Sequence, residues 1–191
     1  LCTFIALSEQ EIIFFGIKTV AIAQDTTITI QIQIPISTGV DDVEEEENGL
    51  IYSNSTDLEL IDDGGEQQII GLHFKNIQLP QGAAIEQAYI QFRTDEVSNG
   101  ACELNIYGEA VDDATSFSTT LFDVSNRTST NGLVNWSPDN WSVVGAAGLT
   151  QQTPNIKIII QEIINQSDWE FGNSLNILIS GSGRRVAEAF E

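Results

Sequence analysis

Carboxylates in short acidic segments are the side chains of this chain whose spacing suggests chemistry. The chain has 28 acidic and 7 basic residues, for a formal net charge of −21. Ca²⁺ takes about six to eight oxygen ligands, and no segment here has the spacing of an EF-hand loop. We expect either a calcium site or plain solvated acidic loops, and the candidate ligands are Asp41, Asp42, Glu44, Glu45, Asp62, Asp63, Asp95, Glu96, Asp112 and Asp113.

The adjacent arginines Arg184 and Arg185 stand out in so acidic a sequence. A guanidinium pairs with a carboxylate through two parallel hydrogen bonds, so we expect pairing with Glu188 or an acidic loop; anion binding is the alternative. The single histidine, His73, alternates out of phase with its apolar neighbours and is predicted to face solvent. One histidine and no Gly-x-Ser-x-Gly segment give a serine hydrolase no support.

Aromatic side chains raise the alternative of carbohydrate binding, because their rings can stack on sugar faces. Trp136 and Trp141 lie in one segment, Trp-Ser-Pro-Asp-Asn-Trp, which is equally suited to plug one end of a β-sandwich. A pair of carboxylates could hydrolyse a glycoside, but 28 acidic residues nominate no pair. We predict no enzymatic activity; the candidate stacking residues are Trp136, Trp141 and Trp169, with Tyr52, Tyr89 and Tyr107.

The cysteines and the charge limit the classes of partner. Cys2 and Cys102 are too far apart in the sequence for a zinc-binding motif. Either the two cysteines form a disulfide, within one chain or between chains, or Cys102 is a buried free thiol. A net charge of −21 repels nucleic acid and anionic lipid, and the apolar stretch before residue 24 is too short and too charged to span a bilayer. Asn-x-Ser/Thr sequons predict glycosylation and export, unless they merely reflect polar β loops, and their asparagines are Asn54, Asn126, Asn135, Asn140 and Asn165.

Residues 27–36 carry isoleucine at every second position. Side chains alternate across a strand, so this stretch predicts a strand with one apolar and one polar face. The same alternation recurs in residues 70–74, 88–92, 102–106 and 175–179, with turn residues between. Regular short strands of this kind predict an antiparallel β-sandwich, and the acidic run 41–49 is predicted to be a solvated loop.

One segment has helical spacing instead. Five isoleucines, the first at 156 and the last at 164, follow the i, i+3, i+4, i+7, i+8 pattern of an apolar helix face. Thr153 is placed to cap the helix and Pro154 suits the first helical position. We predict one short helix over about residues 154–165.

The N-terminal segment, residues 1–24, is apolar and precedes the predicted domain of residues 25–191. Ala21-Ile22-Ala23 resembles a signal-peptide cleavage site, so a removed leader is one interpretation. If the segment is retained, it can add as a strand to the sheet of a neighbouring copy, and head-to-tail repetition of that contact makes a filament. The candidate assembly residues are Phe4, Ile5, Ile12, Ile13, Phe14, Phe15, Ile17, Val20 and Ile22.

Residues 71–92 resemble the strand–loop–strand "LRFxxxxIPxGAxIxxAxLxF" of the DNRLRE and disaggregatase-related extracellular jelly-roll modules. The resemblance covers residues 27–191. The chain resembles an uncharacterised domain of secreted bacterial multidomain proteins more closely still. This resemblance implies a jelly-roll sandwich outside the cell, where relatives act in adhesion, scaffolding or polysaccharide binding, and it implies no activity. The further matching segments are residues 41–45, 136–138, 172–177 and 181–188.

These observations together predict an all-β, antiparallel jelly-roll β-sandwich with one short α-helix. We expect an extracellular, glycosylated structural protein that polymerises with copies of itself through residues 1–24, with Ca²⁺ as the candidate cofactor. A carbohydrate-binding module that takes a polysaccharide is the alternative. Nucleic acid and a membrane span are not expected.

Overall fold

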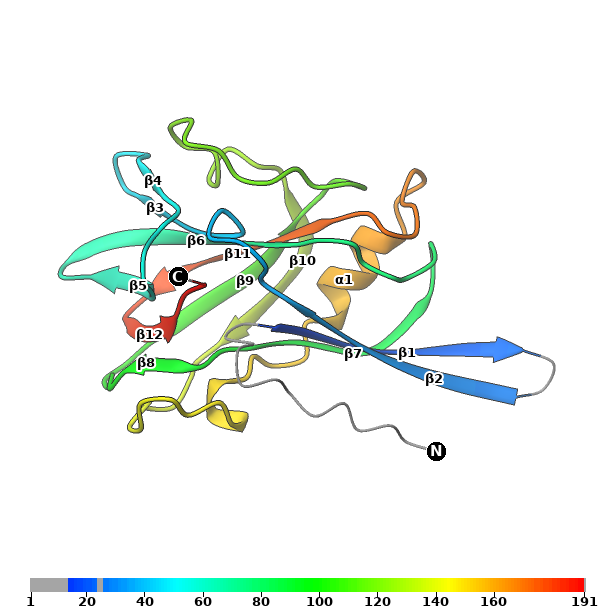
Figure 1. Ribbon diagram of the computed structural model, residues 1–191, viewed down its shortest axis with the longest axis horizontal. Coiled ribbons are helices and arrows are strands. Elements are labelled where there is room, and N and C mark those ends of the chain that lie inside the picture. The colour runs from blue at the N-terminus through cyan, green and yellow to red at the C-terminus, as the bar shows by residue number, and fades with distance from the viewer. Residues whose placement is uncertain (1–13, 24–25, 191) are drawn as a thin grey trace.

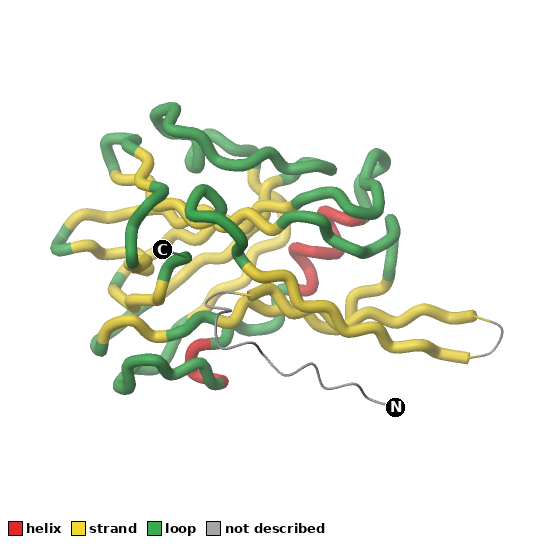
Figure 2. The backbone as a smooth tube through the Cα atoms, in the orientation of Figure 1, coloured by secondary structure: helices red, strands yellow, loops and turns green. Residues whose placement is uncertain are grey.

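A computed structural model describes residues 14–23 and 26–190 of the chain, and strands are its main regular secondary structure (Figures 1 and 2). Every strand pair is antiparallel. The predicted all-β class with one short α-helix is therefore confirmed, while the jelly-roll order of strands stays a prediction. None of the described helices is long and apolar enough to cross a membrane.

The strands form two sheets. The smaller sheet has the order β2-β1-β7, and the larger has the order β10-β9-β11-β6-β5-β12-β8, with β3 added beside β6 and β4 beside β3. The smaller sheet consists of β1 (Phe14–Ala23), β2 (Thr26–Pro35) and β7 (Ala84–Gln91). The larger consists of β3 (Asp42–Glu46), β4 (Ile51–Tyr52), β5 (Asp57–Asp63), β6 (Glu66–Phe74), β8 (Thr94–Glu96), β9 (Glu103–Glu109), β10 (Ser129–Trp136), β11 (Leu175–Ser182) and β12 (Arg184–Glu188).

One main hydrophobic core lies between the sheets and α1. The alternating residues of β6, β7, β9 and β11 point into it, as the two-residue period predicts. Burying an aliphatic or aromatic side chain of this size contributes about 1.5–3 kcal/mol, so these faces hold the sheets together. Cys102 is a buried free thiol within this core, which confirms that interpretation of the residue. Cys2 lies outside the described residues.

The helix α1 (Lys157–Ile164) follows the short 3₁₀ turn η1 (Leu149–Gln151) and begins three residues later than predicted. The predicted cap at Thr153 is wrong, because its hydroxyl accepts the N–H of Ile90 in β7. Residues 151–156 therefore run along one edge of β7 and hold its backbone, instead of starting the helix. The predicted apolar stripe is correct, and its buried members are Ile156, Ile159, Ile160, Ile163 and Ile164.

Part of the N-terminal segment forms β1, which pairs with β2 on one side and with β7 on the other. Phe15 and Ile17 are buried in the core, and the Phe15 ring lies 5.3 Å from that of Phe74. This half of the segment therefore completes the sheet of its own chain, and not that of a neighbouring copy as predicted for Phe15 and Ile17. Phe14, Val20 and Ile22 also lie in β1, and the other candidate assembly residues, Phe4, Ile5, Ile12 and Ile13, lie outside the described residues.

Two local predictions are wrong. Residues 42–46 of the acidic run 41–49, expected to be a solvated loop, form β3, because Val43 packs into a second small core with Leu178 and the strand pairs with β6. His73 is buried and not solvent-facing, since its Nδ1 lies 2.6 Å from Oδ1 of Asn176. Burial lowers the pKa of His73 below its ordinary value, which favours the neutral ring. Both predictions failed for the same reason: a strand face that was assumed to be exposed to solvent is covered by other side chains of the protein.

Candidate functional site

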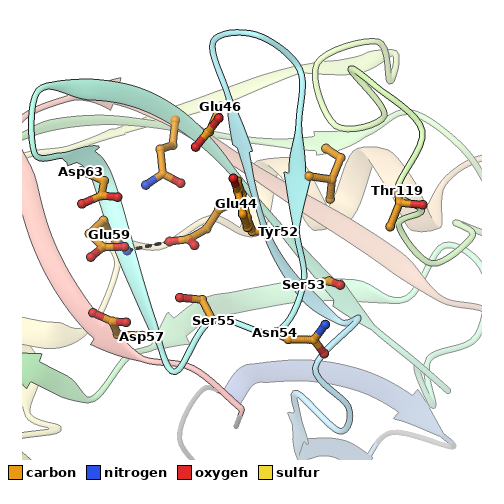
Figure 3. Close-up of a pocket in the computed structure, with 12 residues that line it drawn as sticks. Glu44, Glu46, Tyr52, Ser53, Asn54, Ser55, Asp57, Glu59, Asp63 and Thr119 are labelled. Carbon is orange, nitrogen blue, oxygen red and sulfur yellow. Dashed lines mark hydrogen bonds between the residues drawn. The ribbon is translucent and has the colours of Figure 1, made fainter.

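The larger sheet forks at β6. Strand β3 pairs with β6 over Gln68–Leu72, while β5 pairs with it only at Glu66 and Gln67, next to the tight turn that joins the two strands. Both lie on the edge of β6 opposite β11, so β3 and β5 diverge. A hollow of about 690 Å³ opens between them (Figure 3).

We call this space the acidic hollow, since five of its lining residues carry carboxylates. They come from β3 and β5, where side chains two residues apart share a face. The half-exposed ring of Tyr52 and the side chain of Gln68 also line it. The lining comprises Glu44, Glu46, Asp57, Glu59 and Asp63, with Ile51, Tyr52, Ser53, Asn54, Ser55, Gln68 and Thr119 (Figure 3).

Glu44 and Glu59 face each other across the fork. Oε1 of Glu44 accepts the backbone N–H of Glu59 at 3.0 Å, so this carboxylate replaces the strand partner that β5 lacks there (Figure 3). Glu44 is only 4% exposed. Burial raises its pKa to about 8, and the charges of Glu59 and Asp57 act in the same direction. Burial also raises the pKa of Glu59, so the pair can hold a proton near neutral pH.

A second group of carboxylates shares Asp57 with the hollow. Asp57, Asp95 and Glu96 each place a carboxylate oxygen within 4.8 Å of the others. Burial and the two neighbouring charges raise the pKa of Asp95. Nη2 of Arg184 lies 3.2 Å from Glu96 and 3.5 Å from Glu59, so one guanidinium already neutralises part of this group. These three carboxylates are the described residues closest to a metal-ligand arrangement.

The predicted calcium ligands do not come together as one site. Asp95 and Glu96 lie beside Asp57, and Glu44 and Asp63 line the hollow, but Asp41 is paired with Lys75 at 2.7 Å, which holds the pKa of Asp41 below its ordinary value although burial opposes this. The remaining candidates serve the backbone or face solvent. Oδ2 of Asp42 accepts the N–H of Phe190, Glu45 accepts those of Val124 and Ser125, Asp62 accepts that of Gly65, Asp113 accepts that of Ser174, and the Asp112 carbonyl accepts from Asn173.

Sequence reasoning did not single out Asp57, Glu59 or Gln68. Asp57 and Glu59 alternate with the buried Leu58 and Leu60, so a strand assignment for residues 57–60 already puts both acids on one face. That alternation was the signal that could have identified them. The register that brings β3 beside them has no local sequence signal, because it depends on the pairing of both strands with β6.

The three tryptophans cannot form a stacking platform, because all three indoles are buried. Trp136 stacks on Phe92 with ring centroids 5.9 Å apart, and Trp141 packs against both rings. This arrangement agrees with the interpretation of the segment as a plug and corrects the assignment of Trp136, Trp141 and Trp169 to glycan stacking. The Trp169 indole N–H donates to the carbonyl of Leu79 inside the core.

The two arginines have different roles. Arg184 pairs with carboxylates as predicted, although with Glu59 and Glu96 and not with Glu188, which contacts Arg93. Arg185 is buried and donates to the backbone carbonyls of Gly100, Pro138, Asp139 and Arg184. The carboxylate partner expected for Arg185 is therefore wrong, because its guanidinium holds loops in place.

All five sequon asparagines are exposed. Asn126 lies in a turn and Asn165 is the C-terminal cap of α1, while Asn54 lines the acidic hollow. Asn135 and Asn140 carry side-chain hydrogen bonds, to Asn105 and to the N–H of Gly100 respectively. Glycosylation at these five residues stays a prediction.

The second candidate region is the outer edge of β2, which we call the β2 edge. Within residues 14–23 and 26–190, β2 pairs with no strand except β1. Strands β1 and β2 extend together beyond the body of the molecule (Figure 1). Ile36 is buried, Ile34 and Ile32 are partly buried, and Ile30 is 46% exposed, so the apolar face of β2 emerges from the core along the strand.

No family model, curated protein or solved structure matches this chain. The acidic hollow and the β2 edge are the two candidate regions considered for ligand or partner binding. They differ in charge, since the hollow gathers carboxylates and β2 carries no charged residue.

Proposed function

We propose that this chain is a non-enzymatic extracellular structural protein whose copies assemble by strand addition through the N-terminal hairpin β1–β2. The observation that carries the proposal is the β2 edge, ten residues long and unpaired among the described residues. An unpaired edge presents a row of N–H and C=O groups that another strand can satisfy. The contact forms between the β2 edge of one copy and a sheet edge of the next.

The composition of β2 supports an edge that pairs with another strand, because it lacks the features that usually block such pairing. Natural proteins usually block exposed edge strands with charged side chains, prolines or bulges. Residues 26–34 are Thr-Thr-Ile-Thr-Ile-Gln-Ile-Gln-Ile, without a charge or a proline until Pro35 closes the strand. The bulge in this sheet falls between Lys18 and Thr19, where β1 meets β7, and leaves the β1–β2 register regular.

Charge supports a second copy as the partner. Two molecules that each carry a formal charge of −21 repel across most of their surface. Strand β2 is uncharged and β1 carries only Lys18, so two copies can approach along these strands with little repulsion, and Asp25, between the strands in the sequence, is the one acidic residue of residues 14–35. The emergent isoleucine face, with Ile30 at its exposed end, adds apolar area to the main-chain hydrogen bonds.

The other features of the surface support an extracellular, non-enzymatic role. Five exposed sequons suit a glycosylated secreted protein. Glu44 and Glu59 interact directly, whereas glycosidases hold their two carboxylates about 5–9.5 Å apart so that the scissile bond fits between them. The buried indoles leave the carbohydrate-binding alternative without its expected platform.

The test is the substitution Ile30→Glu, which adds a charge to the β2 edge without disturbing a buried side chain. We expect wild-type protein to form oligomers or filaments by analytical ultracentrifugation and electron microscopy. Ile30→Glu should raise the dissociation constant of the contact at least about tenfold, which corresponds to about 1.4 kcal/mol. Deletion of residues 1–24 is unsuitable, because it removes Phe15 and Ile17 from the core.

The matched control is Ile158→Glu on α1, where the wild-type side chain is 48% exposed. This variant adds the same charge to an isoleucine of the same exposure, away from the hairpin, and should assemble like the wild type. A wild-type protein that stays monomeric at millimolar concentration would refute the proposal. So would equal assembly of the two variants.

A further inference from the structure

The acidic hollow is larger than a single metal ion needs. Its volume of about 690 Å³ compares with about 30 Å³ for each water of liquid water, so it accommodates a small organic molecule. Polar groups from β3, β5 and the segment after β4 converge on it (Figure 3). Its size therefore points to an organic ligand.

The charge of the hollow points to a cation. Five carboxylates line it, and Arg184 is the only basic side chain within the described part of the chain that pairs with any of them. Even when Glu44 holds its proton, the remaining acids outnumber that single guanidinium. Like charges gathered in a cleft with low-dielectric walls raise the local concentration of ions of opposite sign.

Gln68 offers the hollow an amide that is free to bind a ligand. Its side chain lines the hollow and the residue is only 6% exposed, yet its amide makes no hydrogen bond to any group in the described ranges. Its amide atoms are not among the fully buried polar atoms that lack a partner in the described residues, so they reach the open space of the hollow and can pair with a ligand there. A ligand that offers both hydrogen-bond donors and acceptors would satisfy it, which a bare metal ion does only for the carbonyl oxygen.

Tyr52 supplies an aromatic surface in the same hollow. The residue is half exposed and lies beside Ser53, Asn54 and Ser55 on the lining (Figure 3). An ammonium group over a tyrosine ring gains about 0.5–1 kcal/mol at an exposed site. The aromatic ring, the amide and the carboxylates together match a protonated amine carried on an apolar chain or a sugar ring.

We propose that the acidic hollow binds a small organic cation, a protonated primary amine that also carries further hydrogen-bonding groups, such as a polyamine or an amino sugar. The ammonium donates three hydrogen bonds to carboxylates of β3 and β5, the body of the ligand packs on Tyr52, and its other polar groups pair with Gln68. This binding is independent of the β2 edge. The tighter carboxylate group, Asp57 with Asp95 and Glu96, is already contacted by Arg184 and is less suited to a second cation.

The experiment is isothermal titration of the full chain with spermidine and with glucosamine oligomers at fixed ionic strength. Uncharged 1,4-butanediol and glucose serve as matched ligands, and CaCl₂ is titrated separately. We expect one amine molecule to bind per chain. The amine that binds with the lower dissociation constant shows whether the ligand class is a polyamine or an amino sugar. Tyr52→Leu and Asp63→Asn should each weaken binding about three- to tenfold.

The control variant is Glu170→Gln, which removes one exposed acid outside the hollow and should change amine affinity less than about twofold. Circular dichroism checks that each variant folds. Amine binding that Glu170→Gln weakens as much as Asp63→Asn would overturn the proposal, as would amine binding no stronger than that of the uncharged ligands. One-to-one Ca²⁺ binding that Asp57→Asn abolishes, together with no amine binding, would replace it with a divalent-cation site. Ile30→Glu should bind the amine normally, so the two proposals fail separately.

Discussion

The β2 edge and the acidic hollow are opposite in charge character, although they belong to the same molecule. At the β2 edge, ten residues expose backbone groups and no charge, so another uncharged strand can approach. In the hollow, carboxylates from two diverging strands crowd together and one of them, Glu44, is forced toward its neutral form. Both regions arise where a sheet is incomplete. If both proposals hold, an incomplete sheet binds a further strand where its edge is neutral and a cation where its edge is acidic.

The largest expected effect concerns the stability that β1 contributes by packing into the core. Phe15→Ala removes a fully buried ring that packs on Phe74, so it should lower the free energy of unfolding by about 3–5 kcal/mol. Urea denaturation at two protein concentrations measures the loss. Phe171→Ala, at an exposed phenylalanine, should change it by less than about 0.5 kcal/mol. A loss that shrinks at low protein concentration would show that β1 is supplied by another copy.

The next effect concerns the acid pair. The pKa of Glu44 rises from its usual 4.5 to about 8 on folding, so between these values the folded state binds a proton that the unfolded state has released. Stability therefore falls as the pH rises from about 5 to 8, with a slope of up to about 1.4 kcal/mol per pH unit, and levels off above pH 8.

Glu44→Gln should flatten that dependence, because the amide cannot ionise and its oxygen still accepts the Glu59 N–H. The variant should be more stable than the wild type at pH 8 when both are unfolded in urea. Glu170→Gln, which removes an exposed acid, should keep the wild-type slope. Parallel curves for Glu44→Gln and the wild type would show that this carboxyl is ionised in the folded state.

The smallest expected effect is the opposite salt dependence of association at the β2 edge and of amine binding in the hollow. Raising NaCl from about 0.02 to 0.5 M shortens the range of charge interactions to a few ångströms. Repulsion between copies falls, so association at the β2 edge should strengthen about threefold, while amine binding in the hollow should weaken by at least as much. Sedimentation and titration at the two salt concentrations measure both. Changes of the same sign would mean that one region does not have the charge character described here.

Much of the fold was predictable from local pattern. The isoleucines of residues 27–36 predicted β2, and the i, i+3, i+4 stripe predicted α1, because burial on one face leaves a period in the sequence. The predictions failed where a polar residue has a buried partner far along the chain. His73 meets Asn176 and Glu44 meets Glu59, and neither contact has a periodic signal.

The candidate site shows the same division. Glu44, Asp63, Asp95 and Glu96 were predicted as cation ligands from composition, but composition could not separate them from Asp41, which is neutralised by Lys75. Asp57, Glu59 and Gln68 entered the site only through strand register. For the tryptophans the sequence left a plug and a glycan platform open, because an aromatic residue in a loop is compatible with either, and their burial decided for the plug.

By itself the sequence determined the antiparallel strands, the single helix, the strong negative charge and the uncharged stretch that becomes β2. Each of these is a property of neighbours along the chain, set by side-chain period or by composition. The tertiary structure decided that Phe15 and Ile17 belong to the chain's own core, and that β3 and β5 diverge from β6 to gather carboxylates around a hollow. Those outcomes depend on which distant strands pair, and pairing is fixed by the burial of both faces at once.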